Sequence, residues 1–320
     1  MADIIKNRSE ILFLYDVTDA NPNGDPNDEN KPRIDEETGV NIVTDVRLKR
    51  TVRDYLYEYK KQDIFIREER DEKGKLKTKE ERLKDYNSPN DNVLLEKCID
   101  LRLFGATTAV KKKRMTFTGP VQFKYGRSLH RVNLTFVKGT TVMHAQKDPK
   151  PQKDEEPKEA KEQGTFTERY ILPYSLIAFY GVVNETAAAT QEIPLTEADI
   201  DLLMEAIWHG TKNLISGSKF GQIPRFLMQV IYNKGENFYL GELDKRLILR
   251  SDLEDKAIRK ISDVKIDISR LVADLAANKD KISKIRLKVD DHINFLKDGK
   301  DVKIDAVLKE AEFKVKFFEF

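Results

Sequence analysis

Residues 19–29, DANPNGDPNDE, have polar side chains at alternating positions and a glycine at the sixth, as a calcium-binding loop does. Such a loop also needs a bidentate glutamate at its twelfth position and a helix on each side. Here Asn30 is the twelfth residue, and the preceding EILFLYDV favours a strand over a helix. Pro22 and Pro26 remove two backbone donors. We interpret the segment as a polar turn after a buried strand, and we predict no metal ion and no cofactor.

Basic residues form the second chemical pattern. Residues 101–147 contain no acid at all, although the whole chain has a net charge of only +2. A segment of one sign suggests that a polyanion supplies the counter-charge, and nucleic acid is the polyanion we favour. The alternative is a basic surface that acids elsewhere in the fold balance. The candidate phosphate contacts in this and two shorter basic stretches are Arg47, Lys49, Arg50, Arg53, Lys111, Lys112, Lys113, Arg114, Lys219 and Arg225.

The sequence offers little for catalysis. The four histidines (His130, His144, His209 and His292) are scattered, and neither an HExxH motif nor a Walker phosphate loop is present. The single cysteine, Cys98, lies in the apolar context LLEKCIDL, which predicts an inert buried thiol. We therefore expect no catalytic residue.

Composition bounds the class of protein. A chain of 320 residues can bury a large core. One cysteine excludes an internal disulfide framework, and no apolar run approaches the length of a membrane span. The start of the chain does not resemble a secretion signal. We expect a soluble cytoplasmic protein that does not bind a membrane.

The elements that must position these residues follow from periodicity. Residues 11–17 read as a strand, and a helix is predicted to begin after Thr44, with Leu48, Val52 and Leu56 facing a sheet. Residues 67–91 are charged and nearly free of apolar side chains, which is typical of a solvated excursion. Further strands are expected at 115–123, 131–137, 170–183 and 225–232, and a second helix after Thr196.

This order of strands and helices is the split βαβ pattern of a ferredoxin-like or RNA-recognition-type sheet, an α+β fold. Residues 147–164 have no apolar periodicity and contain three prolines, so they are not expected in the core. A fold of this kind supports many activities, and function has to be argued from sites.

Six segments occur in an order that makes the chain resemble one family. They are NPNGDP, VTDVRLKRTVRDYL, DLRLFGA, FTGPVQFKYGRS, LPYSLIAFYG and SKFGQIPRFL, and they extend over roughly the first 230 residues. The chain resembles the CRISPR RNA-binding backbone subunit of type I CRISPR Cascade complexes, of the RAMP superfamily, in the type I-B and I-C (Csh/Csd-like) branch. The C-terminal third matches only loosely.

The resemblance implies a modified RNA-recognition-type palm over residues 1–235. Within it, a helical finger insertion would occupy about 62–105 and a protruding thumb hairpin about 138–168. Residues 236–320 would form a C-terminal extension that packs on the palm. The expected partners are CRISPR RNA, copies of the same chain along it, target DNA through the guide, and the large and 5′-handle-binding subunits of Cascade.

The resemblance also implies roles for residues. Lys49 and Arg50 would contact RNA phosphates, and Lys219 lies in a loop that would flank the same groove. The NPNGDP turn, with Asn21 and Asn23, would place polar groups at the mouth of that groove. A metal-dependent target-RNA endoribonuclease of type III kind, using Asp25 or Asp28, is the alternative from a different class. A generic single-strand-binding protein is the third.

Overall fold

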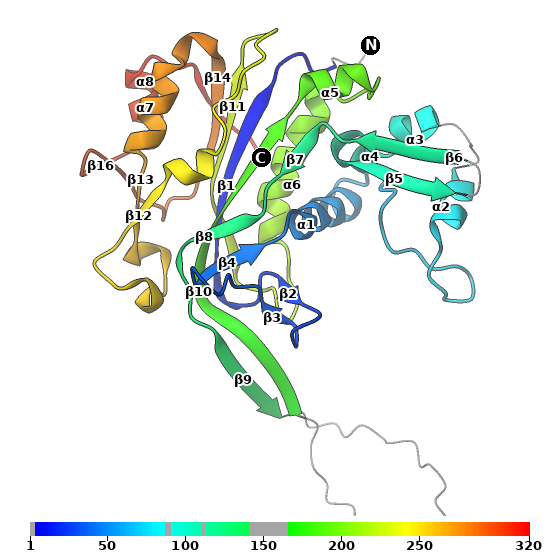
Figure 1. Ribbon diagram of the computed structural model, residues 1–320, viewed down its shortest axis with the longest axis horizontal. Helices are drawn as coiled ribbons and strands as arrows, with labels where there is room; N and C mark the ends of the chain where they lie inside the picture. The colour runs from blue at the N-terminus through cyan, green and yellow to red at the C-terminus, as the bar shows by residue number, and fades with distance from the viewer. Residues whose placement is uncertain (1–3, 87–90, 111–112, 141–165) are drawn as a thin grey trace, which may run out of the picture.

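The computed structural model describes residues 4–86, 91–110, 113–140 and 166–320, and one large sheet forms its centre (Figure 1). All neighbouring strands of this nine-stranded sheet are antiparallel except β14 and β17. The main path is β17 (Val315–Phe317), β14 (Ile282–Val289), β11 (Gln222–Tyr232), β1 (Ser9–Ala20), β10 (Phe166–Val183), β8 (Gly126–Arg131) and β4 (Val40–Val43), with β7 (Val121–Phe123) and β9 (Thr135–Thr140) also on β10.

Two helices cover one face of this sheet. They are α1 (Asp45–Glu58) and α6 (Glu197–Lys212), which pack against each other and on the side chains of β1 that include Ile11 and Phe13. Thr44 and Thr196 cap them as predicted, because each side chain accepts a hydrogen bond from the backbone N–H three residues on. Leu48, Val52 and Leu56 of α1 are buried in this core, also as predicted.

The C-terminal residues cover the opposite face. Leu12 and Leu14 of β1 point there and join a second apolar core with Phe226 and Met228 of β11. Because both faces of β1 are covered, its residues from Ser9 to Val17 are all buried, as a central strand requires. The covering elements include β12 (Ile248–Arg250), β13 (Lys265–Asp267), α7 (Ser269–Ala277), β15 (Phe295–Lys297), β16 (Lys300–Val302) and α8 (Ile304–Glu310), and the four strands among them form a sheet in the order β12-β13-β15-β16.

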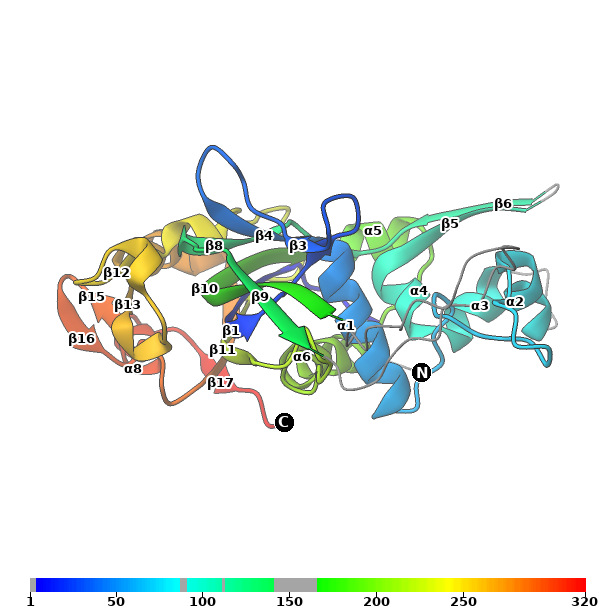
Figure 2. The same cartoon turned by 90° about the horizontal axis from the view of Figure 1, so that it is seen from below.

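An insertion between α1 and β7 extends to one side of the sheet (Figures 1 and 2). It holds α2 (Lys79–Asp85), α3 (Asp91–Lys97), α4 (Ile99–Phe104) and a hairpin of β5 (Gly105–Val110) and β6 (Lys113–Thr118). The described residues of 67–91 are mostly exposed, as expected of a solvated excursion, but they include the helix α2, which was not predicted. Arg82 of α2 is buried and contacts Glu69, Asp85 and the carbonyl of Ile64. Ion pairs anchor this helix, and apolar periodicity cannot detect them.

Two of the expected strands are divided. Residues 115–123 do not form one strand: β6 ends at Thr118 and β7 begins at Val121, and between them Gly119 packs so closely against Phe104 that a Cβ atom would lie 2.0 Å from the backbone there. Residues 131–137 likewise belong partly to β8 and partly to β9. The pair β9–β10 projects well beyond the rest of the sheet (Figure 1). Residues 141–165, which include the segment 147–164, lie outside the described residues.

The remaining short elements complete the description. They are β2 (Gly24–Asp25), β3 (Lys31–Pro32), α5 (Glu185–Thr190) and the 3-10 turns Leu243–Arg246, Asp255–Ala257, Ile261–Asp263 and Lys279–Lys281. Of the helices within the described residues, none combines the length and apolarity needed to cross a membrane. The predicted combination of helices and a sheet is confirmed, and the sheet has nine strands.

Candidate nucleic-acid interface

The polar turn at residues 21–30 joins three parts of the fold. The Asn21 backbone N–H donates to the carbonyl of Ser218 over 2.8 Å, and its side-chain amide donates to the carbonyl of Asn30 over 2.7 Å. Gly24 has no room for a side chain, since a Cβ atom there would lie 2.0 Å from Asn30 Oδ1. The turn therefore has a fixed shape, and the buried Asn21 side chain is part of its internal bracing.

Asn23 ties the same turn to α1. Its Oδ1 accepts hydrogen bonds from both the backbone N–H and the hydroxyl of Thr44, each over 2.9 Å. Thr44 in turn caps the helix by accepting from the N–H of Arg47. Asn21 and Asn23, both predicted to line an RNA groove, thus use their side chains to position the elements around it.

Two cations meet beside this turn. Arg47, on the flank of α1 that faces α6, donates to Thr51 Oγ1 over 3.2 Å, and Lys219 Nζ donates to the carbonyl of Asn21 over 2.6 Å. Among the described residues no carboxylate forms an ion pair with either side chain. Burial, with the nearby Arg47 charge, lowers the pKa of Lys219 to about 8, and burial also lowers the pKa of Arg47. We call Arg47 and Lys219 the cation pair.

The loop that carries Lys219 is held in place from several directions. Gly221 has a φ of +106° and approaches the carbonyl of Thr18 so closely that a Cβ atom would lie 2.4 Å from it. The Thr18 N–H donates to the Gly221 carbonyl over 3.0 Å, and Arg169 of β10 donates to the Gly217 carbonyl over 2.9 Å. The loop is therefore built into the fold and presents Lys219 in a defined place.

A cavity of about 330 Å³ adjoins this region at the base of the projecting β10 strand. Tyr170 lies in its lining and donates from its hydroxyl to Glu29 over 2.8 Å. Glu29 and Glu168 both line the cavity, so carboxylates face its interior. The cation pair, in contrast, forms no ion pair with a carboxylate of the described residues. A phosphate is therefore favoured at the cation pair and disfavoured in the cavity. Nothing in the periodicity of the sequence had indicated that Arg169 or Tyr170 would lie beside the candidate site.

The other predicted cations of α1 have carboxylate partners. Lys49, which was expected to contact an RNA phosphate, is mostly buried: it pairs with Asp45 over 2.9 Å and contacts Gln122. Arg50 is more exposed and pairs with Asp54 over 2.7 Å. Arg53 pairs with the fully buried Asp100 over 3.0 Å. Because α1 packs against the insertion on this side, Arg53 serves to join two elements.

Arg225 is buried in the centre of the sheet. It lies between two acids, at 2.9 Å from Asp16 and 2.6 Å from Asp290, and Tyr174 also donates to Asp16. Burial raises the pKa of Asp16, and the Arg225 charge opposes that effect. The charge of the Arg225 guanidinium is thus neutralised inside the protein. Arg225 does not supply the unpaired positive charge that a phosphate contact needs.

Half of the basic cluster of residues 111–114 lies in the described part of the β5–β6 hairpin. Lys113 is opposite Val110 in that hairpin, and Arg114 is opposite Ala109. Lys111 and Lys112 lie outside the described residues. The hairpin belongs to the insertion and points away from the central sheet (Figure 2), whereas Arg47 lies in α1 and Lys219 in the loop between α6 and β11, so the two groups of cations belong to separate elements.

The acids proposed for a nuclease are engaged in the polar turn. Asp25 pairs with Arg33 over 2.6 Å and accepts from the N–H of Asn27, and Asp28 pairs with Lys31 over 2.6 Å. Within the described ranges there is no cluster of three or more histidine, cysteine or acidic side chains that could hold a metal ion. Cys98 is buried, and burial raises its pKa to about 12, as expected of an inert thiol.

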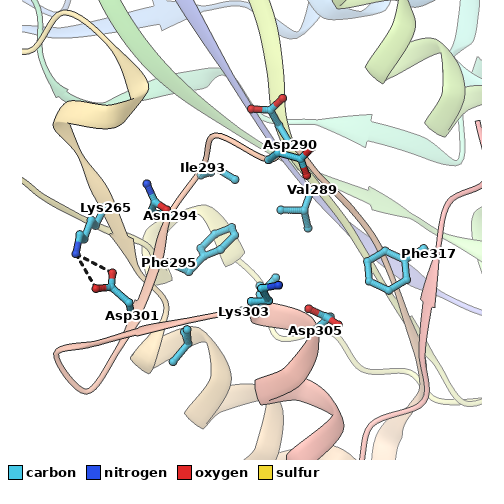
Figure 3. Close-up of a pocket in the computed structure, with 13 residues that line it drawn as sticks. Lys265, Val289, Asp290, Ile293, Asn294, Phe295, Asp301, Lys303, Asp305 and Phe317 are labelled. Atoms are coloured by element: carbon cyan, nitrogen blue, oxygen red, sulfur yellow. Dashed lines mark hydrogen bonds and ion pairs between the residues drawn. The ribbon is translucent and has the colours of Figure 1, made fainter.

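A larger cavity of about 690 Å³ lies in the C-terminal residues (Figure 3). Four aspartates line it, at positions 290, 291, 301 and 305, against two lysines, Lys265 and Lys303. Lys265 pairs with Asp301 over 2.7 Å, so one of those two positive charges is already neutralised. Asp290 and Asp305 also have partners, Arg225 and Lys309, so the lining has no excess of positive charge for a polyanion, and this cavity is not a candidate for nucleic acid.

Comparisons with known proteins agree with one another. The family model described as CRISPR-associated protein Cas7 matches residues 7–269. A curated protein of that name from Haloferax volcanii is 31% identical over 313 residues, which cover 88% of this chain and 86% of the relative.

Solved structures show a similar fold. A chain of a CRISPR RNA-guided surveillance complex in a pre-nicking state matches with a TM-score of 0.54 and 11% identity, covering 95% of this chain and 99% of that one. A chain of a second CRISPR RNA-guided surveillance complex matches with a TM-score of 0.51 and 15% identity, with the same coverage. The chain belongs to the Cas7 family of CRISPR-associated proteins.

Proposed function

We propose that this protein is a non-catalytic, CRISPR RNA-binding backbone subunit of a type I Cascade surveillance complex, of the I-B branch. Several copies line up along one CRISPR RNA, each binds the RNA backbone, and the exposed bases of the guide pair with target DNA. The large subunit and the 5′-handle-binding subunit complete the assembly. Family membership supports the general role.

The observation that carries the proposal is the cation pair. Arg47 and Lys219 come from two elements that are 172 positions apart in the chain (219 − 47), and the fold brings both to the polar turn. The Arg47 charge near Lys219 costs free energy, since it disfavours the charged form of Lys219. A phosphate at this place removes that cost. RNA backbone contacts of this kind position the strand and do not read its sequence.

The shape of the chain supports the proposed arrangement. The sheet order β11-β1-β10-β8 with α1 and α6 on one face serves as the palm, and residues 62–105 serve as fingers. The projecting β9–β10 pair is the base of the thumb, which we place over RNA held by the neighbouring copy. Residues 236–320 form the extension on the palm.

Salt titration of RNA binding tests the phosphate site. Replacing Arg47 and Lys219 together by Ala should flatten the plot of log affinity against log salt by about 1.4, because each lost phosphate contact on a single strand removes about 0.7. The matched control replaces Lys300 and Lys303, which are exposed in the C-terminal residues, and should leave the slope unchanged. An unchanged slope in a folded Arg47/Lys219 variant would remove the cation pair from the site and leave Lys111–Arg114 as the better candidate.

Native purification tests the assembly. We expect an RNA of uniform length to accompany the protein, together with further subunits. Heterogeneous RNA without other subunits would instead favour a generic single-strand-binding protein. The ribonuclease alternative is not favoured, because Asp25 and Asp28 are ion-paired in the polar turn. Replacing either by Ala should leave RNA cleavage in the presence of magnesium at the same background level.

A further inference from the structure

Two large apolar side chains stand exposed on the loop next to the cation pair. Ile215 is 71% exposed and Phe220 is 68% exposed, although they are separated by only four residues. A single exposed apolar residue is common on protein surfaces. Two within one short turn are less easily explained by chance, and we call Ile215 and Phe220 the apolar tip.

The turn holds the apolar tip outward. The backbone N–H groups of Lys219 and Phe220 both donate to the carbonyl of Ser216 over 3.0 Å, which closes the chain into a tight turn between the two side chains. Gln222 adds a side-chain hydrogen bond to the carbonyl of Lys219 over 3.0 Å. With Gly221 held against β1 and Arg169 bonded to Gly217, the loop has little freedom to fold Phe220 back onto the protein.

The charges around the tip indicate its partner. Lys219 precedes Phe220 in the chain, and Arg47 lies near Lys219. An apolar patch that docks another protein is usually depleted in charge at its centre, whereas single-strand nucleic-acid sites combine cations for the backbone with aromatic rings for the bases. Every base has a flat face that can stack on such a ring, so this contact does not depend on sequence.

We propose that Phe220 is a stacking platform for a base of the bound RNA, beside the phosphate held by the cation pair. The inference rests on the proposed function and adds to it a contact with a base. One loop then holds a phosphate of the RNA backbone and also orients a neighbouring base. Ile215 extends the apolar surface next to the Phe220 ring. Because the ring and the two cations belong to one braced unit, the base is oriented without any hydrogen bond to its edge.

A pair of short RNA probes tests the platform on the full-length protein. The first probe is oligo(A), and the second has the same length and backbone but lacks its bases. The wild type should prefer oligo(A) by roughly 5- to 150-fold, the factor that corresponds to stacking one base on one aromatic side chain. Phe220→Ala should lose most of this preference and keep the salt slope of the wild type, while Phe220→Trp should retain the preference.

Phe220→Trp also provides a direct signal. The natural Trp208 is buried, so an indole at position 220 reports on the surface, and oligo(A) should quench its fluorescence more than the base-free probe does. Phe317→Ala, which removes another half-exposed phenylalanine far from the cation pair, is the matched control and should bind both probes as the wild type does.

Three results would overturn the inference. An undiminished preference for oligo(A) in a folded Phe220→Ala variant would show that the ring does not stack on a base. If Phe220→Ala instead disturbed only the association of copies on a long RNA in sedimentation, the tip would be a contact between copies. Failure of the wild type to bind either probe would overturn both this inference and the proposed function, which separates that case from the other two.

Discussion

Lys219 is the residue whose charge is most sensitive to its surroundings at the proposed interface. Burial and the Arg47 charge bring its pKa down to about 8, so its ammonium group loses its proton just above neutral pH in the free protein. An RNA phosphate favours the charged form, and binding must therefore raise the pKa of Lys219. By linkage, RNA affinity should fall as the pH rises through 8.

The Lys219→Arg variant isolates this effect. A guanidinium stays charged throughout this pH range, so the variant should bind RNA with an affinity that changes much less between about pH 7 and about pH 9. Oligo(A) and oligo(C) are suitable probes because their bases do not titrate there. The same decline with pH in Lys219→Arg as in the wild type would contradict the role assigned to Lys219.

His130 is a second titratable residue, and it acts on stability. Its Nε2 accepts a hydrogen bond from the N–H of Leu176 over 3.3 Å, so Nδ1 carries the proton and donates to the carbonyls of Arg131 and Asp255. Burial lowers the pKa of His130 below its ordinary value of 6.5. As the pH falls, His130 therefore takes up a proton at a higher pH in the unfolded chain than in the folded protein.

The free energy of unfolding should consequently fall as the pH drops below about 6.5, and His130 should make no pH-dependent contribution above about pH 7.5. His130→Gln keeps a donor and an acceptor but cannot titrate. Urea denaturation at about pH 7.5 and about pH 5.5 should show a smaller loss of stability for this variant than for the wild type. Equal losses would mean that other groups cause the acid sensitivity.

At the scale of the element, α1 carries two arginines, Arg50 and Arg53, that are three residues apart and lie in different environments. Arg50 pairs with Asp54 on the same helix near the surface, and Arg53 pairs with Asp100, which has no exposed surface. Asp100 also accepts from the backbone N–H groups of Phe65 and Ile66. Arg53 is thus the link by which α1 holds the insertion.

Removing Arg53 should leave a buried carboxylate without its counter-charge. We expect Arg53→Ala to lower the free energy of unfolding by about 3 to 5 kcal/mol, and Arg50→Ala by no more than about 1 kcal/mol. Urea denaturation of the two variants, measured in parallel, checks this difference. If both variants were equally stable, the Arg53–Asp100 pair would not join the two elements in the way the structure indicates.

At the scale of the molecule, the central sheet depends on the C-terminal residues. Deleting residues 236–320 would expose the second face of the sheet, including Leu12, Leu14, Phe226 and Met228. Each such side chain contributes about 1.5 to 3 kcal/mol when buried, so these four alone amount to about 6 to 12 kcal/mol, which is comparable with the roughly 5 to 15 kcal/mol by which a domain is stable. The shortened chain should therefore aggregate or lose cooperative unfolding.

Solubility, dye binding to exposed apolar surface and urea denaturation measure this outcome. A soluble shortened chain with a single cooperative transition would show that residues 1–235 fold alone. The family match to residues 7–269 ends within the covering elements, and β14 and β17, which follow it, still complete the sheet. The extension is part of one fold with the residues before it.

The sequence by itself determined the elements whose signals are local. Thr44 and Thr196 start their helices through contacts three residues away, and the spacing of Leu48, Val52 and Leu56 set the buried side of α1. The six ordered motifs were enough to indicate the family. Local signals were weaker for α2, which has no apolar stripe, and for the break at Gly119, which depends on contact with Phe104.

Only the tertiary structure decided which of the predicted cations pair with carboxylates. Arg47, Lys49, Arg53 and Arg225 look alike in the sequence, yet three of them pair with carboxylates, and Asp16 and Asp100 come from distant parts of the chain. The charge available to a phosphate depends on these long-range neighbours and on burial, and neither follows from spacing along the chain. For the same reason, Lys219 became a candidate with a physical basis only once the fold placed it beside Arg47.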